Sequence, residues 1–228
     1  GLNRAKRIFD ALGIYDYCEK CRKYVEILKK DSGKVKVNQR IAGINIFAER
    51  GTEYDIEKVS GASVENMSSF FGFYVLIAKC MLGQASECMD VIKEFWGGML
   101  KMGATTFWED FDIEWMKNAI PITEIVPPGK DDIHGDFGKY CYKGFRHSLC
   151  HGWASGPTAV LSNYILGAKI TKPGGDEITI KPRIGKLKWV KGDFPTKYGT
   201  VHIEHYKENG HVKTVYTAPK EITVVLGD

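Results

Sequence analysis

An acidic cluster stands directly behind aromatic residues in the stretch GATTFWEDFD, residues 103–112. Glu109 follows Trp108, and Asp110 and Asp112 come within the next three residues. A carboxylate held against apolar surface can work as an acid or base, and rings beside polar groups are typical of sugar sites. The simpler interpretation is the first turn of a helix, where acidic side chains favour the positive end of the dipole. The stretch by itself leaves both interpretations open.

A second stretch, SLCHGWASGP at residues 148–157, has a related composition. His151 and Trp153 stand just before a predicted helix, among small residues that let the backbone approach a ligand closely. A histidine, a glycine and a tryptophan in a row are usually structural. Because both stretches lie at helix ends and beside the irregular segment 113–147, we expect them to form a common cleft.

Composition and charge exclude several classes of protein. The chain has 228 residues, 43% of them hydrophobic, which is enough for a sizeable core in one domain or two. Its formal charge is +4, but Lys and Arg are spread among 28 acidic residues, so we expect no nucleic-acid partner. No apolar run approaches the roughly 20 residues of a membrane span, so we expect no membrane partner. The opening GLNRAKRIFDALG predicts an amphipathic helix without a starting methionine, which indicates a fragment.

The six cysteines favour free thiols over a metal site. Cys18 and Cys21 form a C-x-x-C pair, which can be half of a zinc site or a redox pair. No second pair at similar spacing follows, so we expect no metal. Cys80 and Cys88 lie in apolar helical stretches, where a free thiol is usually a small buried hydrophobe. Unpaired cysteines suit a reducing compartment, so we expect a cytoplasmic location.

Helical periodicity dominates the chain before residue 168. Apolar residues at helical spacing predict helices at 16–30, 37–51, 63–83, 86–103 and 155–167. Asp16 is the expected N-cap of the first, and Gly83 the left-handed residue that ends the third. The third and fourth follow each other at once, which predicts a helical hairpin with wide apolar faces. Such hairpins favour a bundle or a toroid, because no sequence repeat supports a regular solenoid.

After Gly167 the hydrophobic period becomes two. Short antiparallel strands are predicted within 176–182, 199–217 and 221–227, and Asn209-Gly210 predicts a type I′ hairpin turn. The predicted fold class is therefore mainly α followed by β. We expect a helical domain over 1–168 and a small β-sandwich domain over 169–228.

Three segments together resemble a known enzyme family. WGGMLKMGATTFWE (96–109), SLCHGWASGPTAVLSNYILG (148–167) and ITIKPRIG (178–185) are similar to the C-terminal part of bacterial α-L-rhamnosidases of glycoside hydrolase family 78. The resemblance implies part of an (α/α)6 toroid whose funnel holds the sugar, followed by a C-terminal β-sandwich. It also implies inverting hydrolysis of terminal α-L-rhamnosides, a rhamnose-containing glycoside as partner, and neither a metal nor an organic cofactor.

The same resemblance assigns roles to residues of the two stretches. The glutamate of the family's T-x-W-E-type motif falls on Glu109, so the resemblance implies that Glu109 is the general base. The histidine of the H-G-W motif falls on His151, which implies a hydrogen bond to a sugar hydroxyl. Trp108 and Trp153 are implied as apolar walls for the rhamnose ring, and Phe107 is a weaker candidate that suits the core equally well.

One element of the family's site has no counterpart in this sequence. The family's general acid lies in an acidic cluster of earlier helices, whereas a solvated turn explains the acids Glu49, Glu53, Asp55 and Glu57. We therefore expect this chain to carry the general-base half of the site and to be inactive alone. Its open helical face would be covered by the missing N-terminal half or by a second copy. Three aromatic residues of the third helix are expected in the core, namely Phe70, Phe71 and Tyr74.

Two other functions stay open. A noncatalytic carbohydrate-binding module can keep the aromatic pocket and lose the acid. A different (α/α)6-toroid glycosidase or lyase would share the architecture, although the order of the two motifs and the terminal β-domain argue against it.

Overall fold

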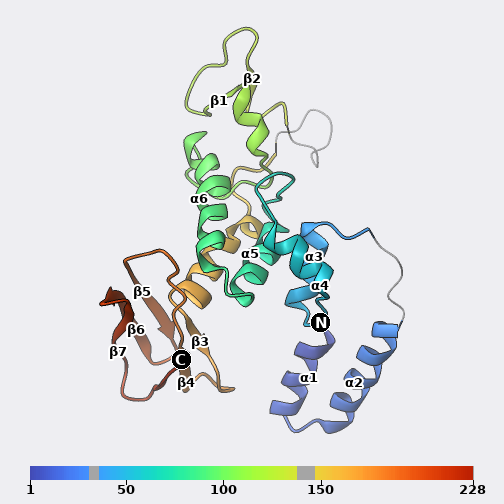
Figure 1. Ribbon diagram of the computed structural model, residues 1–228, viewed down its shortest axis with the longest axis vertical. Helices are drawn as coiled ribbons and strands as arrows, with labels where there is room; N and C mark the ends of the chain where they lie inside the picture. The colour runs from blue at the N-terminus through green and yellow to red at the C-terminus, as the bar shows by residue number, and fades with distance from the viewer. Residues whose placement is uncertain (31–35, 138–146, 228) are drawn as a thin grey trace.

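The computed structural model describes residues 1–30, 36–137 and 147–227, and Figure 1 shows its helices and strands. The described helices lie before residue 166, and two three-stranded sheets lie after residue 167. The sheets lie at one lower corner of Figure 1 and the first two helices at the other, with the remaining helices between and above them. The predicted fold class, mainly α followed by β, is confirmed.

Six α-helices are described before residue 102. They are α1 (Leu2–Ala11), α2 (Tyr15–Lys30), α3 (Gln39–Phe47), α4 (Glu53–Ser60), α5 (Gly72–Met81) and α6 (Ala85–Lys101). The helices predicted at 16–30, 37–51 and 86–103 are confirmed as α2, α3 and α6, and the amphipathic opening is α1. Asp16, the expected N-cap of α2, lies inside its first turn, because the helix begins at Tyr15.

The helix predicted at 63–83 is shorter than expected. α5 begins at Gly72, and the residues before it form turns closed by bonds such as the one from the Gly72 amide to the Ser68 carbonyl, 2.7 Å. Gly83 ends the helix with a φ of +79°, as predicted. A short turn then leads into α6, so the predicted helical hairpin is confirmed.

Close packing of α3 against α5 builds part of the helical core. A Cβ atom on Gly43 would lie 2.9 Å from backbone atoms of Tyr74 and Val75, so the absence of a side chain allows this approach. The inward faces of α5 and α6 are buried in one cluster, to which Leu76 and Phe95 contribute. Trp108 belongs to the same cluster.

A capping box explains why α4 forms. The Thr52 hydroxyl accepts a bond from the Asp55 amide, 3.3 Å, and the Asp55 carboxylate accepts one from the Thr52 amide, 2.8 Å. This corrects the expectation of a solvated turn for one of its acids, because Asp55 is buried. Glu53 and Glu57 are exposed as expected.

The described part of the irregular segment predicted after residue 112, up to residue 137, contains short elements. A 3₁₀ turn η1 (Ile113–Lys117) is followed by β1 (Ala119–Ile120), which pairs in parallel with β2 (Asp131–Asp132). These elements lie above α6 in Figure 1.

The last helical region leads into the sheets through Gly167. It consists of the 3₁₀ turn η2 (Gly152–Ser155), the helix α7 (Gly156–Val160) and the π-helical turn η3 (Leu161–Ile165). The helix predicted at 155–167 is thus present, with a π-helical second half. Gly167 follows with a φ of +77°.

Two three-stranded sheets make up the β-part. The first has the order β3-β4-β8 and the second β5-β6-β7, with the bounds β3 (Ala168–Ile170), β4 (Glu177–Ile180), β5 (Trp189–Thr196), β6 (Gly199–Glu208), β7 (His211–Thr217) and β8 (Thr223–Leu226). One pairing differs from the predicted antiparallel arrangement, since β8 runs parallel to β4 with Ile178 opposite Val224. The sequence pattern also missed β5, which contains Gly192 and Pro195 and lies at a sheet edge, where proline is tolerated.

The β6–β7 connection is the predicted tight turn. Asn209 and Gly210 have φ values of +50° and +84°, as a type I′ turn requires. Inward-facing Val201 and Ile203 of β6 pack in one cluster with Ile178 of β4. Among the residues described, no helix has the length and apolar character that a membrane span requires.

Candidate active site

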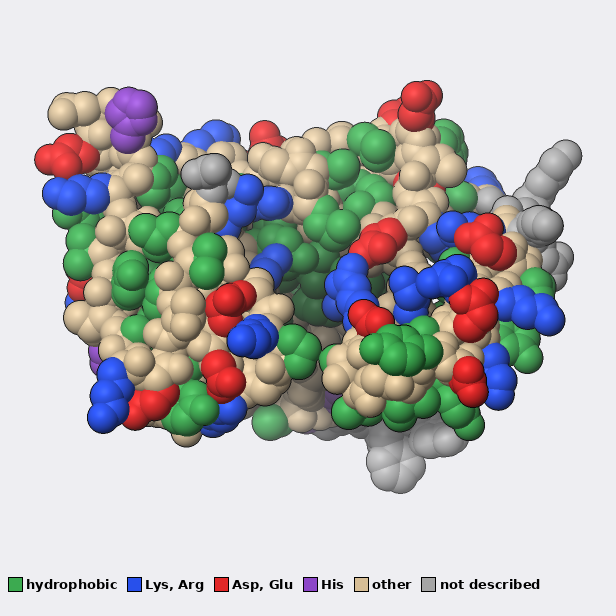
Figure 2. All heavy atoms as spheres, turned by 90° about the horizontal axis from the view of Figure 1, so that it is seen from below, with side chains coloured by type: hydrophobic (Ala, Val, Ile, Leu, Met, Phe, Trp, Pro, Cys, Tyr) green, Lys and Arg blue, Asp and Glu red, His purple; other side chains and the backbone are tan. Residues whose placement is uncertain are grey.

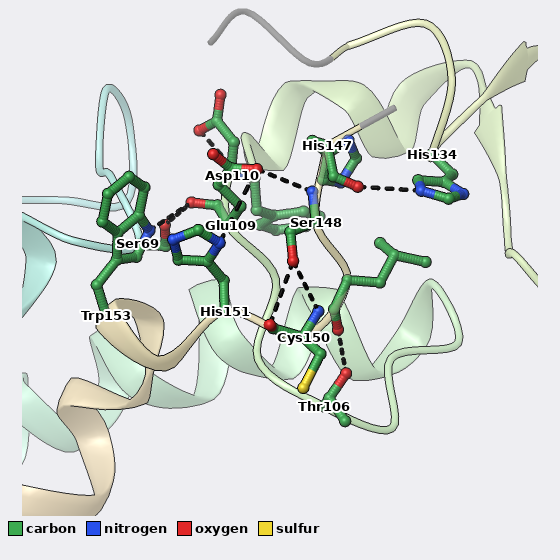
Figure 3. A network of polar contacts seen from close by, with 12 residues as sticks. Ser69, Thr106, Glu109, Asp110, His134, His147, Ser148, Cys150, His151 and Trp153 are labelled. Atoms are coloured by element: carbon green, nitrogen blue, oxygen red, sulfur yellow. Dashed lines mark hydrogen bonds and ion pairs between the residues drawn. The ribbon is translucent and has the colours of Figure 1, made fainter. Parts of the chain in front are cut away.

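Main-chain hydrogen bonds hold the two aromatic stretches side by side. The Glu109 amide donates to the Ser148 carbonyl, 2.8 Å, and the His151 amide donates to the Phe107 carbonyl, 2.7 Å. The Thr106 hydroxyl adds a bond to the Leu149 carbonyl (Figure 3). The two stretches that were expected to form a common cleft therefore lie against each other, and the cleft itself stays a prediction.

The Glu109 carboxylate is oriented by the second stretch. Its Oε2 accepts a hydrogen bond from the Ser148 amide, 2.8 Å, and lies 4.0 Å from Nδ1 of His151 (Figure 3). The side chain is 15% exposed. Within the described part of the chain, the other oxygen, Oε1, has no hydrogen-bond partner. Glu109 is thus held through one oxygen and has the other open to a water molecule or ligand.

Trp153 lies beside His151 on the surface. The two ring centroids are 4.1 Å apart, and the indole Nε1 donates to the Glu109 carbonyl, 3.1 Å. The buried Ser69 hydroxyl donates to the same carbonyl (Figure 3). Trp153 is 45% exposed, so one side of its ring is available to a ligand.

The burial of two aromatic residues, Trp108 and Phe70, is the opposite of what was expected. Trp108, expected as an apolar wall, is fully buried and packs against Phe111 and His147, so its ring cannot reach a sugar in this arrangement. Phe70, expected in the core, is 38% exposed, and its ring centroid lies 5.6 Å from that of Trp153. Phe107 is half-buried at the edge of the core.

Only one of the cluster's acids begins a helical turn. The Asp112 carboxylate accepts a hydrogen bond from the Glu114 amide, 3.0 Å, and caps η1. Glu109 instead bonds to the second stretch. The interpretation as a helix start therefore holds for Asp112, and the interpretation of Glu109 as part of a working site stays a prediction.

Sequence reasoning missed Ser69 and Ser148 as neighbours of Glu109, and Phe70 as a neighbour of Trp153. Ser148 acts through its backbone amide, which every residue but proline carries, so no residue type marks the role. Ser69 and Phe70 precede α5 in a segment whose aromatic residues continued the apolar stripe. Ser69, a polar residue in the middle of that apolar stripe, was the signal that the segment does more than fill the core.

His147 lies behind the carboxylate in an aromatic environment. It is 1% exposed, its ring lies about equally far from Trp108 and Trp115, with centroids 6.1 and 6.0 Å away, and neither ring nitrogen has a hydrogen-bond partner among the described residues. Burial, and next to it the nearby His134, lower the pKa of His147. The imidazole is therefore neutral at pH 7.

Acidification should destabilise the fold through two histidines. Burial also lowers the pKa of His205, so the unfolded chain binds protons on His147 and His205 at a higher pH than the folded chain does. We expect the free energy of unfolding to be constant above about pH 7 and to fall below about pH 6.5, by up to about 1.4 kcal/mol per pH unit for each histidine.

Urea unfolding between pH 7.5 and 5 measures this slope. His147→Gln should reduce it, whereas His211→Gln, at an exposed position of β7, should leave it unchanged. A slope that is the same in all three proteins would refute the assignment.

The described residues contain no cluster of side chains suited to hold a metal ion. No group of three or more His, Cys, Asp or Glu residues among them is arranged to hold an ion. Cys18 and Cys21 are buried free thiols.

Comparison with known proteins finds similarity to α-L-rhamnosidases. Residues 167–227 match the family model of the bacterial α-L-rhamnosidase C-terminal domain. A search of curated proteins found no match. Among solved structures, the chain is similar over 99% of its length to the GH78 family rhamnosidase of Bacillus sp. GL1, with 19% identity and a TM-score of 0.72.

Two further structures resemble the same 99% of the chain at 15% identity. They are the α-L-rhamnosidase of Dictyoglumus thermophilum, with a TM-score of 0.71, and that of Streptomyces avermitilis complexed with L-rhamnose, with a TM-score of 0.69. The chain covers 25% of the Bacillus and Dictyoglumus chains and 22% of the Streptomyces chain, so it spans about a quarter of their length. The protein therefore shares its fold with a part of the GH78 α-L-rhamnosidases, and its residues 167–227 are similar to the bacterial α-L-rhamnosidase C-terminal domain.

Proposed function

We propose that this chain carries the general-base half of an inverting glycosidase site for terminal α-L-rhamnosides. The observation that carries the proposal is the half-buried Glu109 carboxylate, held through Oε2 and flanked by His151 and Trp153. The similarity to rhamnosidases, one of them complexed with L-rhamnose, supports the choice of sugar.

Glu109 would act through its unbonded oxygen. The Ser148 amide fixes Oε2, so Oε1 can accept the proton of a water molecule as that water attacks the anomeric carbon. The hydrogen bond fixes the orientation of the carboxylate, and a general base must be held within reach of the proton that it takes. Backbone bonds on both sides of Glu109 keep this oxygen in place before the substrate arrives.

His151 and Trp153 would position the sugar. The His151 ring, partly exposed beside Glu109, can bond to a ring hydroxyl. The exposed rings of Trp153 and Phe70 form a continuous apolar surface on which the C–H groups of a deoxy sugar can pack. This surface would take the role that the family resemblance implied for Trp108, which is to pack against the rhamnose ring.

Inversion requires a second carboxyl group on the other side of the sugar. The two groups are about 6.5 to 9.5 Å apart in inverting enzymes, which leaves room for the water. We place this general acid outside the chain, in the part of the toroid that lies upstream in its structural relatives. Exposed apolar side chains of the first two helices, among them Ile8, Leu12 and Leu28, are the face that this part or a second copy would cover.

The chain alone should not hydrolyse rhamnosides. An aryl α-L-rhamnoside with a good leaving group is the sensitive substrate, because it depends least on protonation of the leaving oxygen. We expect no turnover above background from the purified 228-residue chain. Turnover that disappears in Glu109→Gln would show that a second carboxylate within these residues serves as acid, and the half-site proposal would be wrong.

Weak rhamnose binding should depend on Trp153. Half a pocket keeps the stacking surface but lacks positioning contacts, so we expect a Kd of about 1 mM or weaker, about 4 kcal/mol of binding free energy. Trp153→Ala should abolish the signal in a titration followed by NMR. Trp189→Ala, which removes another exposed tryptophan on β5, is the matched control and should bind like the original chain. Equal loss in both variants, or in neither, contradicts the assignment.

A further inference from the structure

A large cleft separates the first helices from the β-sheets, on a different part of the molecule from Glu109. It has a volume of about 820 Å³ and is lined by residues of α1, α3, α5, η3, β3 and β5. Figure 2 views the molecule from below and shows a hollow between the sheets on the left and the first helices on the right. Hydrophobic side chains lie inside it, and Lys and Arg side chains stand at its sides. None of the residues around Glu109 lines this cleft.

Basic side chains outnumber acidic ones around the cleft. Arg4, Arg7, Lys169 and Arg183 line it, and Glu49 is the acid among the lining residues. Glu49 is already paired with Arg7, at 3.1 Å. Among the described residues, the other three cations have no carboxylate within ion-pair distance.

The three unpaired cations line the same cleft. Burial, and next to it the charge of Arg183, lower the pKa of Lys169, and Arg4 lowers it further. Their positions are fixed by neutral partners: Arg183 donates to the Cys80 carbonyl, and Lys169 Nζ lies 3.6 Å from the Tyr164 ring centroid. Arg4 lies over the Phe47 ring, 4.6 Å from its centroid. The fold thus holds like charges together, a repulsion that a bound anion would offset.

Aromatic rings also line the cleft and give it apolar surface. Tyr164, Phe73 and Phe194 line it with half-buried rings, as does Phe47. The space is also much larger than an inorganic ion needs and lies in the range of ligand pockets. Rings of this kind can pack against the C–H faces of a sugar, while Arg183 and Lys169 pair with its charged groups.

From this combination we infer that the cleft binds a carboxylate-bearing saccharide, such as an oligouronate. The carboxylates would lie against Arg4, Lys169 and Arg183, and the sugar faces against Phe73 and Phe194. This inference concerns a second site and rests on the cleft alone, so it stands or fails independently of the catalytic role of Glu109.

Calorimetry of the 228-residue chain with trigalacturonate tests the inference. Galactotriose is the neutral counterpart, and inorganic phosphate tests for an anion site without sugar recognition. We expect trigalacturonate to bind, galactotriose to bind at least tenfold more weakly, and the affinity for trigalacturonate to fall as salt rises from 50 to 300 mM. Phosphate binding as tight as that of trigalacturonate, or no binding of trigalacturonate, overturns the inference.

Two lysine variants locate the binding. Lys169→Met removes the central cation but keeps the length of the side chain, and should weaken trigalacturonate binding by roughly tenfold, as expected for one charge-assisted hydrogen bond. Lys220→Met removes the same charge at an exposed position after β7, outside the cleft, and should change the affinity less than twofold. Equal affinities in the two variants would place the ligand elsewhere and refute the cleft as its site.

Discussion

Replacing Glu109 with glutamine should lower turnover of an aryl α-L-rhamnoside by roughly 100-fold to 10,000-fold, the range typical of losing a general base. The assay uses a protein that also contains the proposed general acid, because inverting hydrolysis needs two carboxyl groups. Glutamine keeps the shape of the side chain, and its amide oxygen can still accept the bond from the Ser148 amide. It cannot take a proton from water, so kcat should fall and KM should change little.

A matched variant separates this effect from a general loss of charge. Glu114→Gln alters an exposed acid of η1 in the same region, which forms an ion pair with Lys117, and should leave turnover unchanged. Both proteins should unfold at the same denaturant concentration as the parent within error. If the turnover of Glu109→Gln were close to that of the parent, Glu109 would not be the general base.

The largest effect on stability is expected at Gly167. An alanine Cβ there would lie 2.1 Å from the Lys181 carbonyl oxygen and 2.6 Å from the Pro182 nitrogen, and these backbone atoms cannot move aside as a flexible side chain can. The residue also has a φ of +77°, which is unfavourable for alanine. We expect Gly167→Ala to reduce the free energy of unfolding by at least about 3 kcal/mol.

Gly210→Ala provides the comparison. Gly210 has a similar φ of +84°, but nothing lies within 4 Å of its added Cβ. Its alanine variant should therefore lose only the cost of the backbone conformation, about 1 to 2 kcal/mol. Similar losses in the two variants would show that the close contact with residues 181 and 182 has little effect.

Short sequence patterns were sufficient to predict elements whose structure depends on neighbouring residues in the chain. The turn at Asn209 and Gly210 was predicted because two residues that tolerate positive φ stand between alternating strands. α6 was predicted because its apolar side chains recur at helical spacing over its whole length. In the candidate site, Glu109 and His151 were expected to meet because two motifs of one family carry them, and the structure places them 4.0 Å apart.

The remaining features depend on contacts that no short pattern encodes. Trp108 and Phe70 are both aromatic, and the sequence cannot say which of them faces the core, since that depends on how the two stretches are joined by backbone bonds. The parallel pairing of β4 with β8 joins segments far apart in the chain, whereas the periodicity of each strand is the same for either direction. The roles proposed for Glu109, His151 and Trp153 remain predictions until the variants are measured.

The position of β8 has a consequence for the order in which the protein can fold during synthesis. The β5-β6-β7 sheet is built from neighbouring segments and can form as soon as they leave the ribosome. The β3-β4-β8 sheet cannot be completed until Thr223–Leu226 has been added, because these residues pair with β4. Until then one edge of β4 is unpaired, which is the kind of surface that joins wrongly with other chains. Newly made chains should therefore be most prone to aggregate in the interval between the synthesis of β4 and that of β8.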